Sequence, residues 1–240
     1  MRTIIMFLYF AVYLIYALPA MWRAQSLAKR GDTAGVDRIL NIHVTRWART
    51  LLRLAGTRVI VEGQENLPKE DAVLYVSNHQ GDFDIPVLLT HLDGPHAFVA
   101  KKELLKVPLV KYWMSLLQCV FLDRDHPRQA LASILKSVDT LKGGHSVIIF
   151  PEGTRSRGRK MGEFKFGAMK IAQRAQVPII PLAVDGSFRV MEQQGIWVKP
   201  ATVRLKILPP LDTAGLTRED AAAMNDRIYQ LIAEALQENC

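Results

Sequence analysis

The sequence predicts an α/β fold, with a mixed, mostly parallel sheet that is flanked by helices and preceded by two N-terminal helices. Two observations indicate this architecture. From residue 57 onward, short apolar runs rich in β-branched residues alternate with stretches of helical periodicity, as expected of strands that are connected by covering helices. Residues 1–55 instead combine a long uncharged run with an amphipathic stretch. We therefore expect membrane-associating helices at 1–55 and one α/β domain at 56–240.

The first N-terminal helix is predicted from the run between Ile4 and Trp22, which contains no charged residue. At about 1.5 Å rise per residue, such a helix covers roughly the 30 Å hydrocarbon core of a bilayer. A cleaved signal peptide has a shorter apolar region of about 7–15 residues and a small-residue cleavage site, and no convincing site follows here. We predict a retained, membrane-associated helix that either spans the bilayer or lies within one leaflet.

The second N-terminal helix is predicted for VDRILNIHVTRWARTLLRLAG, at residues 36–56. Its apolar residues recur at helical spacing, while its arginines fall on another face: Arg46, Arg49 and Arg53. Such a basic amphipathic helix suits a membrane interface, and packing against the α/β domain is an equally good alternative. With the preceding run it would form a two-helix membrane anchor.

Positive charge is concentrated near the N-terminus. Residues 1–60 carry nine Arg and Lys against two Asp, which accounts for +7 of the formal net charge of +8. Because these cations are interleaved with long apolar runs, they favour anionic lipid headgroups over a nucleic acid as the partner. Positive residues on the C-terminal side of the apolar run also predict that the α/β domain lies on the cytoplasmic side of the cell membrane.

Seven short apolar runs predict the strands of the domain: TRVIVEG, AVLYVSN, HAFVAK, CVFLDR, SVIIFPEG, VPIIPLAV and ATVRLKIL. The clearest connecting helix begins near Pro127 and ends at Gly143 and Gly144. The last helix begins after Thr217, which is placed to form a capping box with Asp220. Because ligands bind at the carboxyl ends of strands in such folds, the residues after each run are the candidates for a functional site.

Several classes of chemistry are excluded by the residues that are missing. Cys119 and Cys240 are too few and too far apart for a disulfide framework or a thiolate metal cage. The sequence has no G-x-G-x-x-G motif after a strand, no Gly-Lys-Ser/Thr phosphate loop, no G-x-S-x-G elbow and no H-E-x-x-H motif. We therefore predict neither a metal nor a bound cofactor.

The stretch SNHQGDFDIP, residues 77–86, places a histidine beside two carboxylates directly after an apolar run. His79 paired with Asp82 or Asp84 could handle a proton, provided that Gly81 lets the chain turn tightly before the next helix. The structural alternative is that Asp84 caps that helix, and the two roles can coexist. Spacing alone does not choose between the two aspartates.

A strongly basic loop, PEGTRSRGRK at 151–160, follows the most hydrophobic of the predicted strands. Its single carboxylate, Glu152, is accompanied by four cations: Arg155, Arg157, Arg159 and Lys160. A phosphate suits this loop better than a neutral ligand, while a solvated surface run is the alternative. Lys101 and Arg124 follow neighbouring strands and could reach the same anion.

Four blocks of the sequence, in this order, resemble the motifs of the glycerolipid acyltransferase family, in particular those of bacterial 1-acyl-sn-glycerol-3-phosphate acyltransferases. NHQGDFD is similar to the family's Asn-His-x4-Asp block, VFLDR to its second block, FPEGTRSR to its third and VPIIPLA to its fourth. VAKKELLKVP also resembles the family's lysine segment after the first block. The resemblance covers residues 57–210, and the combination is far more specific than any single block.

The resemblance implies an enzyme that transfers a fatty acyl group from acyl-CoA or acyl carrier protein to the sn-2 hydroxyl of lysophosphatidic acid, which yields phosphatidic acid. It implies that His79 is the general base, that Asp84 is its orienting partner, and that no cofactor is needed beyond the thioester co-substrate. Backbone N–H groups near Gly153 are candidates for stabilising the oxyanion. The implied acceptor site, in which the cations hold the phosphate, comprises Lys101, Arg124, Glu152, Gly153, Thr154 and Arg155.

Two features depart from the family's pattern. The first block lacks its frequent serine and has Gly81 and Asp82 in the middle, and no glycine stands shortly before VFLDR. These departures leave the acceptor open, so glycerol-3-phosphate or another lysophospholipid is the alternative to lysophosphatidic acid. An alternative from another class is a noncatalytic membrane adaptor that binds anionic lipid through its basic N-terminus.

Overall fold

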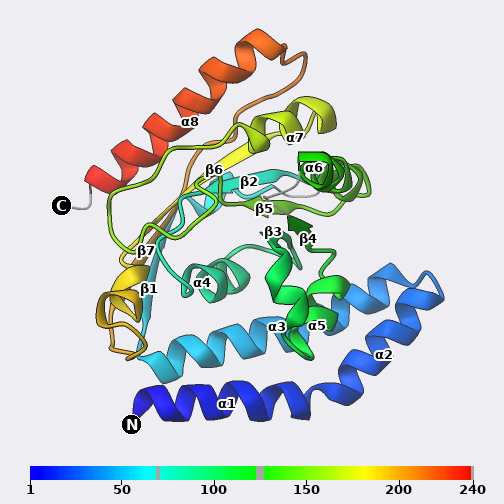
Figure 1. Ribbon diagram of the computed structural model, residues 1–240, viewed down its shortest axis with the longest axis vertical. Coiled ribbons are helices and arrows are strands. Elements are labelled where there is room, and N and C mark those ends of the chain that lie inside the picture. Colours follow the sequence, from blue (N-terminus) through cyan, green and yellow to red (C-terminus); the bar gives the residue numbers. More distant parts are fainter. Residues whose placement is uncertain (69–70, 123–126, 239–240) are drawn as a thin grey trace.

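A seven-stranded sheet lies between two layers of helices in the computed structural model, which describes residues 1–68, 71–122 and 127–238 (Figure 1). The strand order is β1-β7-β6-β2-β5-β3-β4, and among these strands of the described residues β6 and β7 pair antiparallel while the other neighbours pair parallel. The α/β fold with a mixed, mostly parallel sheet is therefore confirmed. The strands are β1 Arg58–Glu62, β2 Leu74–Ser77, β3 Ala97–Lys101, β4 Val120–Leu122, β5 Val147–Ile149, β6 Ile179–Asp185 and β7 Thr202–Ile207.

One face of the sheet is covered by α6 (Pro127–Lys142), α7 (Gly167–Ala175) and α8 (Arg218–Gln237) (Figure 1). Their apolar side chains form one hydrophobic core with the residues of β2 and β5 that point to this face. Thr217 and Asp220 form the predicted capping box at the start of α8. This layer closes one side of the sheet.

The opposite face is covered by α4 (Asp84–His91), α5 (Val110–Leu116) and the N-terminal helices, whose apolar residues form a second core with the sheet. Figure 1 shows α4 and α5 between the sheet and the N-terminal helices. Short 3-10 helices lie in the connections: η1 Gln64–Asn66, η2 Lys102–Lys106, η3 Ser187–Arg189 and η4 Glu192–Gln194.

The N-terminal segment forms three helices where the sequence predicted two: α1 Arg2–Tyr16, α2 Leu18–Lys29 and α3 Thr33–Ala55. The apolar run is divided at Ala17, and α1 and α2 are bent by 48° there. Pro19 explains the break, because its ring has no N–H to donate and clashes with the carbonyl group four residues earlier. Among the described residues no single helix is long and apolar enough to cross a membrane, although α1 and α2 pass that test together as a bent pair.

The predicted amphipathic helix is α3. It begins after Asp32, whose carboxylate accepts the N–H of Gly35 at 2.8 Å, and ends at Gly56 in the left-handed conformation. Its apolar side packs in the core of the α/β domain, while its arginines stay exposed. The structure thus favours the alternative in which this helix packs against the domain.

The site is positioned by the middle of the sheet. β2 lies between β5 and β6 and runs parallel to both, with Tyr75 aligned to Ile148 on one side and Ile180 on the other. Because parallel neighbours end at the same edge of a sheet, the turn after β2 and the loop after β5 lie side by side. These are the two polar segments that the sequence singled out.

Candidate active site

The turn that follows β2 is tied to β6 by two buried amide side chains. Asn78 donates from Nδ2 to the carbonyl oxygen of Val184 at 2.9 Å and accepts at Oδ1 from the N–H of Val184 at 2.8 Å. Gln80 accepts at Oε1 from the N–H of Gly186 at 2.8 Å. Since breaking buried hydrogen bonds leaves unpaired polar groups, this turn is held in one conformation.

His79 and Asp84 meet across this turn. Nδ1 of His79 lies 2.7 Å from Oδ2 of Asp84, which is fully buried. The same carboxylate oxygen also accepts the N–H groups of Gln80 at 2.7 Å and Gly81 at 3.0 Å. An ionised carboxylate can only accept, so Nδ1 carries the ring proton and Nε2 is left with a lone pair that can take a proton. The pair therefore has the geometry that general-base chemistry requires.

Asp84 is the first residue of α4, and no side chain caps that helix at Phe83. Its carboxylate turns back to the preceding loop and binds N–H groups there instead of serving as the cap. The position at a helix N-terminus also favours a negative charge. Asp82, the competing candidate, instead points to the loop after β5 and forms an ion pair with Arg155.

The imidazole ring of His79 is held on one side by Phe150, with the ring centroids 4.1 Å apart and the planes 18° from parallel. The backbone of His79 is fixed as well. Its N–H donates to Oε1 of Glu152 at 2.7 Å, and its carbonyl oxygen accepts the N–H of Ser156 at 2.8 Å. Because all these contacts come from the loop after β5, that loop aligns the histidine.

Glu152 lies beneath His79 and is only 4% exposed. Its second oxygen, Oε2, accepts the N–H of Gly162 at 2.7 Å, so the carboxylate joins the start and the end of the basic loop to the histidine turn. Burial raises the pKa of Glu152, and the two backbone hydrogen bonds partly oppose that effect. The resemblance assigned Glu152 to the acceptor site, and the structure places its carboxylate where it supports the backbone.

Gly153 turns the chain after β5 with a left-handed φ of 73°, a conformation that favours glycine. Its N–H donates to the carbonyl oxygen of Phe150 at 3.0 Å. This N–H is therefore engaged within the turn, and an oxyanion donor near Gly153 has to be a different group. Gly153 and Thr154 both line the cavity described below.

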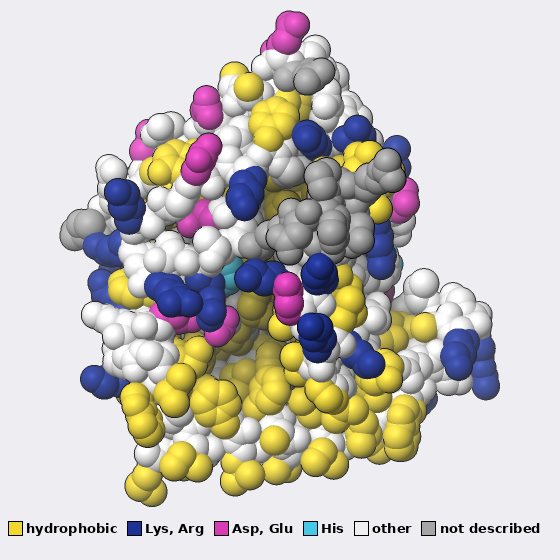
Figure 2. Space-filling view, in the orientation of Figure 1, with side chains coloured by type: hydrophobic (Ala, Val, Ile, Leu, Met, Phe, Trp, Pro, Cys, Tyr) yellow, Lys and Arg dark blue, Asp and Glu magenta, His cyan; other side chains and the backbone are white. Residues whose placement is uncertain are grey.

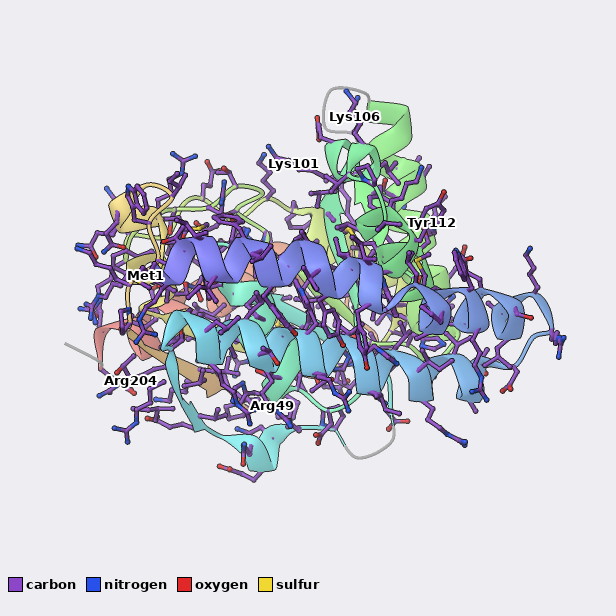
Figure 3. All side chains as sticks on the ribbon, turned by 90° about the horizontal axis from the view of Figure 1, so that it is seen from below. Met1, Arg49, Lys101, Lys106, Tyr112 and Arg204 are labelled. Carbon is purple, nitrogen blue, oxygen red and sulfur yellow. The ribbon has the colours of Figure 1, made fainter. Side chains whose placement is uncertain are left out.

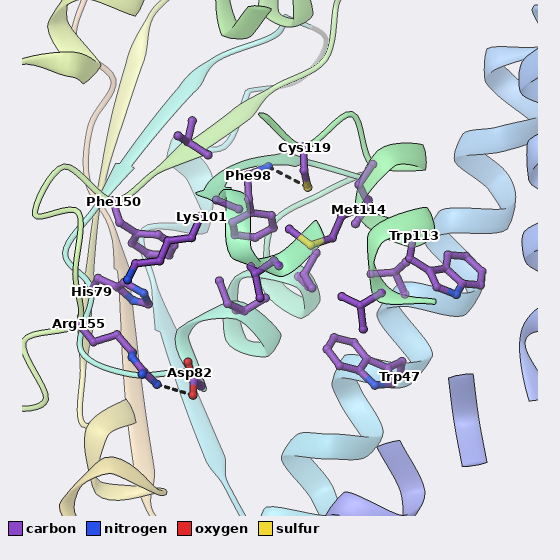
Figure 4. Close-up of a pocket in the computed structure, with 18 of the residues that line it drawn as sticks. Trp47, His79, Asp82, Phe98, Lys101, Trp113, Met114, Cys119, Phe150 and Arg155 are labelled. Carbon is purple, nitrogen blue, oxygen red and sulfur yellow. Dashed lines mark hydrogen bonds and ion pairs between the residues drawn. The ribbon is translucent and has the colours of Figure 1, made fainter. Parts of the chain in front are cut away.

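The predicted phosphate-binding cations have different surroundings. Lys101 extends from the end of β3 toward His79, and Arg155 approaches from the loop after β5 (Figure 4). Arg124, the third predicted cation, lies outside the described residues. Arg159, which the sequence grouped with the basic loop, instead binds the buried Asp185 through Nη2 at 2.7 Å and Nε at 3.2 Å. It therefore fastens the loop to the end of β6.

Sequence reasoning missed Glu192. Its carboxylate accepts the N–H of Asp82 at 2.6 Å and lies 3.4 Å from Nη1 of Arg155. Glu192 also explains why position 81 is a glycine, because the φ of Gly81 is not left-handed and so does not itself favour glycine. A Cβ at Gly81 would lie 2.3 Å from Oε2 of Glu192 and would displace this carboxylate, so the glycine leaves space for Glu192. No local signal could reveal this contact, because Glu192 lies 110 positions from Asp82.

A cavity of about 520 Å³ joins these residues to the N-terminal helices. Its polar end contains His79, Lys101 and Arg155, and the rest is apolar. Figure 4 shows this apolar part extending from Phe98 toward Trp113 of α5 and Trp47 of α3. The volume is in the range of small-molecule sites. Within the described ranges, no group of three or more His, Cys, Asp or Glu side chains could hold a metal ion.

Comparisons with known proteins identify the class. Residues 58–185 match the family described as Acyltransferase. The chain is 33% identical over 210 residues to a probable 1-acyl-sn-glycerol-3-phosphate acyltransferase of Mycoplasma pneumoniae, covering 82% of this chain and 78% of that protein. It is 33% identical to the 1-acyl-sn-glycerol-3-phosphate acyltransferase of Pseudomonas aeruginosa, covering 81% and 77%.

A solved structure is similar over nearly the whole chain. The 1-acyl-sn-glycerophosphate acyltransferase PlsC of Thermotoga maritima superposes with a TM-score of 0.85 at 28% identity, covering 99% of this chain and 94% of that one. The protein belongs to the acyltransferase family. The resemblance found in the four sequence blocks is thereby confirmed, while the role of each site residue stays a prediction.

Proposed function

We propose that the protein transfers a fatty acyl group from an acyl thioester to the sn-2 hydroxyl of lysophosphatidic acid and so makes phosphatidic acid. The observation that carries this proposal is the His79–Asp84 pair, which stands at the polar end of an otherwise apolar cavity. The names of the relatives support the acceptor, since both curated relatives are named as acyltransferases of 1-acyl-sn-glycerol-3-phosphate.

The proposed reaction needs one base. The acceptor's hydroxyl oxygen attacks the thioester carbonyl carbon while Nε2 of His79 takes the hydroxyl proton. The tetrahedral intermediate then breaks its C–S bond, and the departing thiolate recovers the proton. A positioned base contributes about 10²–10⁴ in rate, and the activated thioester makes an enzyme nucleophile unnecessary. Asp84 fixes the ring tautomer and stabilises the imidazolium that forms.

The acceptor phosphate is proposed to bind Lys101 and Arg155, which flank His79 at the mouth of the cavity (Figure 4). Guanidinium groups bind phosphate oxygens through two parallel N–H donors, and a lysine adds a compact charge. Arg124 remains a proposed third cation on the strength of the sequence alone. The phosphate would then lie beside the base, which places the glycerol hydroxyls near Nε2.

The acyl chain is proposed to occupy the apolar part of the cavity. This part is bounded by α1, α3 and α5, with Phe10, Trp47, Trp113 and Leu117 among its lining residues. A fatty acyl chain would remove this surface from water, and burial of apolar area is the main driving force available to it. Both carriers, acyl-CoA and acyl carrier protein, remain candidates for the donor.

The N-terminal helices are proposed to rest in the cytoplasmic leaflet of the cell membrane, with the α/β domain on the cytoplasmic side. Figure 2 shows apolar side chains gathered on the side of the molecule that α1 forms, and Figure 3 shows α1 and α2 crossing that side. Large exposed apolar patches mark interaction surfaces. The most exposed large apolar side chains of α1 are Ile4, Leu8, Ile15 and Tyr16.

Co-sedimentation with anionic lipid vesicles tests this placement. Leu8→Asp together with Ile15→Asp should strongly reduce the fraction of protein bound to the vesicles. The matched control is Leu131→Asp with Leu135→Asp, which changes two exposed leucines of α6 on the far layer. Equal binding of the two double variants would contradict the proposed membrane surface.

The acyl transfer is tested by the release of free thiol from acyl-CoA and from acyl carrier protein when an acceptor is added to the purified protein. We expect release with lysophosphatidic acid and none without an acceptor, and glycerol-3-phosphate run in parallel distinguishes the alternative acceptor. If neither carrier releases thiol with lysophosphatidic acid, the proposed function is wrong.

A further inference from the structure

Arg155, the proposed phosphate ligand, lies between two carboxylates. It forms an ion pair with Asp82, and its Nη1 lies 3.4 Å from Oε1 of Glu192. The same Glu192 oxygen accepts the N–H of Asp82 at 2.6 Å. Figure 4 shows the Arg155–Asp82 pair at the polar end of the cavity, close to His79. A phosphate that binds Arg155 must therefore share the guanidinium with these carboxylates or replace one of them.

The two carboxylates are held very differently. The side chain of Glu192 is 4% exposed, is fixed by the Asp82 N–H, and packs against Gly81 with no space for a Cβ between them. The side chain of Asp82 is 57% exposed, and its carboxylate meets Arg155 at the mouth of the cavity. Asp82 can therefore turn away through solvent, whereas Glu192 can leave only by breaking buried contacts.

We propose that Asp82 is the exchangeable partner of Arg155. It holds the guanidinium while the acceptor site is empty, releases it to the phosphate of the incoming acceptor, and takes it back when phosphatidic acid leaves. Glu192 keeps its place and holds Arg155 at the mouth of the cavity throughout. This inference rests on the proposed function, and it requires no covalent step, because one ion pair of the guanidinium is replaced by another.

The relative strengths of the two pairs allow this exchange. Ion pairs between exposed side chains are weak because water screens them. A phosphate monoester carries a charge of about −1.5 to −2 and three strong acceptor oxygens, so it competes well with a single carboxylate. Because Asp82 competes with the phosphate for Arg155, the apparent affinity for the acceptor equals the intrinsic affinity multiplied by the fraction of protein in which Arg155 is free of Asp82. This competition lowers the affinity for the product by the same factor, because the product carries the same phosphate.

The test compares the kinetics of wild type with Asp82→Asn, which keeps the shape of the side chain and removes its charge. We expect the acceptor KM to fall about two- to fivefold, as expected when a weak exposed ion pair is lost. The inhibition constant of phosphatidic acid should fall by the same factor, while the KM of the acyl thioester stays unchanged. The matched control is Glu163→Gln, which removes an exposed carboxylate just after the basic loop and should change none of these constants.

Each outcome decides the matter. An acceptor KM that is unchanged or raised in Asp82→Asn, measured against an active wild type, overturns the exchange and leaves the proposed function standing. Equal shifts in Asp82→Asn and Glu163→Gln also overturn it, because they would reflect net charge and not the contact with Arg155. If the wild type releases no thiol with any acceptor, the proposed function fails first and the inference fails with it.

Discussion

The turn after β2 and the loop after β5 both supply polar groups to one cavity, yet they are built in opposite ways. Around His79, the carboxylate of Asp84 is fully buried and receives three hydrogen bonds. Around Arg155, a pair with the largely exposed Asp82 lies at the mouth of the cavity. The first arrangement permits one geometry, and the second permits exchange of partners.

This difference matches the two tasks of the proposed reaction. A base must meet the reacting hydroxyl in one orientation, so its surroundings gain from being fixed beforehand. A phosphate site must fill and empty in every turnover, so a permanently strong pair there would delay release of the product. We therefore expect variants of the His79–Asp84 pair to lower kcat and variants of the groups around Arg155 to change the acceptor KM.

The largest effect is expected from Asp84→Asn, which should lower kcat by about 10²–10⁴ with little change in the acceptor KM. The amide that replaces the carboxylate can no longer hold the His79 ring in the tautomer that leaves Nε2 unprotonated. Initial rates at saturating substrates measure this loss, with Asp139→Asn, an exposed aspartate of α6, as the control. If Asp84→Asn raised the acceptor KM and left kcat unchanged, the proposed difference between the His79–Asp84 pair and the groups around Arg155 would be contradicted.

A smaller effect is expected from Arg155→Ala, which should raise the acceptor KM about 10- to 100-fold and leave kcat nearly unchanged. This range follows from the value of about 1.5–3 kcal/mol for a hydrogen bond to a charged group. Titration of lysophosphatidic acid at a saturating thioester concentration measures it, and Arg227→Ala on the exposed side of α8 is the control. An unchanged KM would mean that Arg155 does not hold the phosphate.

The smallest effect is expected from Gly81→Ala, at the point where the two regions touch. The new Cβ would displace the carboxylate of Glu192, so we expect the acceptor KM to rise about two- to fivefold and the free energy of unfolding to fall by about 1–3 kcal/mol. Gly158→Ala, whose Cβ would meet nothing within 4 Å, is the control. A fall in kcat like that of Asp84→Asn would show that the two regions cannot be separated.

Much of the fold could be predicted from local sequence. The seven apolar runs correspond to the seven strands, and the capping box of α8 forms as expected, because periodicity and capping depend on near neighbours. The sequence prediction missed the break at Ala17 because it considered only the apolar character of the run and not Pro19 within it. A proline interrupts the hydrogen bonding of a helix with the turn that precedes it. The sequence also left open whether α3 packs against the α/β domain, since the same amphipathic pattern suits a membrane interface and a protein core.

The site was predictable where its parts are close in sequence. His79 and Asp84, which lie 2.7 Å apart, belong to a single turn and are only five positions apart in the sequence. That turn lies beside the basic loop because the two segments follow neighbouring parallel strands. The contacts of Glu192 and Arg159 were not predictable, because each joins segments that only the folded sheet brings together. Charge counting placed Arg159 with the phosphate ligands, although its partner Asp185 comes from β6.

The central claim, that His79 is the base, is tested most directly by the kcat of His79→Ala for acyl transfer to lysophosphatidic acid. The matched control is His145→Ala, at the opposite end of β5 from the site. We predict that His79→Ala loses about 10²–10⁴ in kcat while it folds normally and keeps its acceptor KM, and that His145→Ala retains the wild-type kcat. A folded His79→Ala protein with a kcat close to that of wild type would contradict this account.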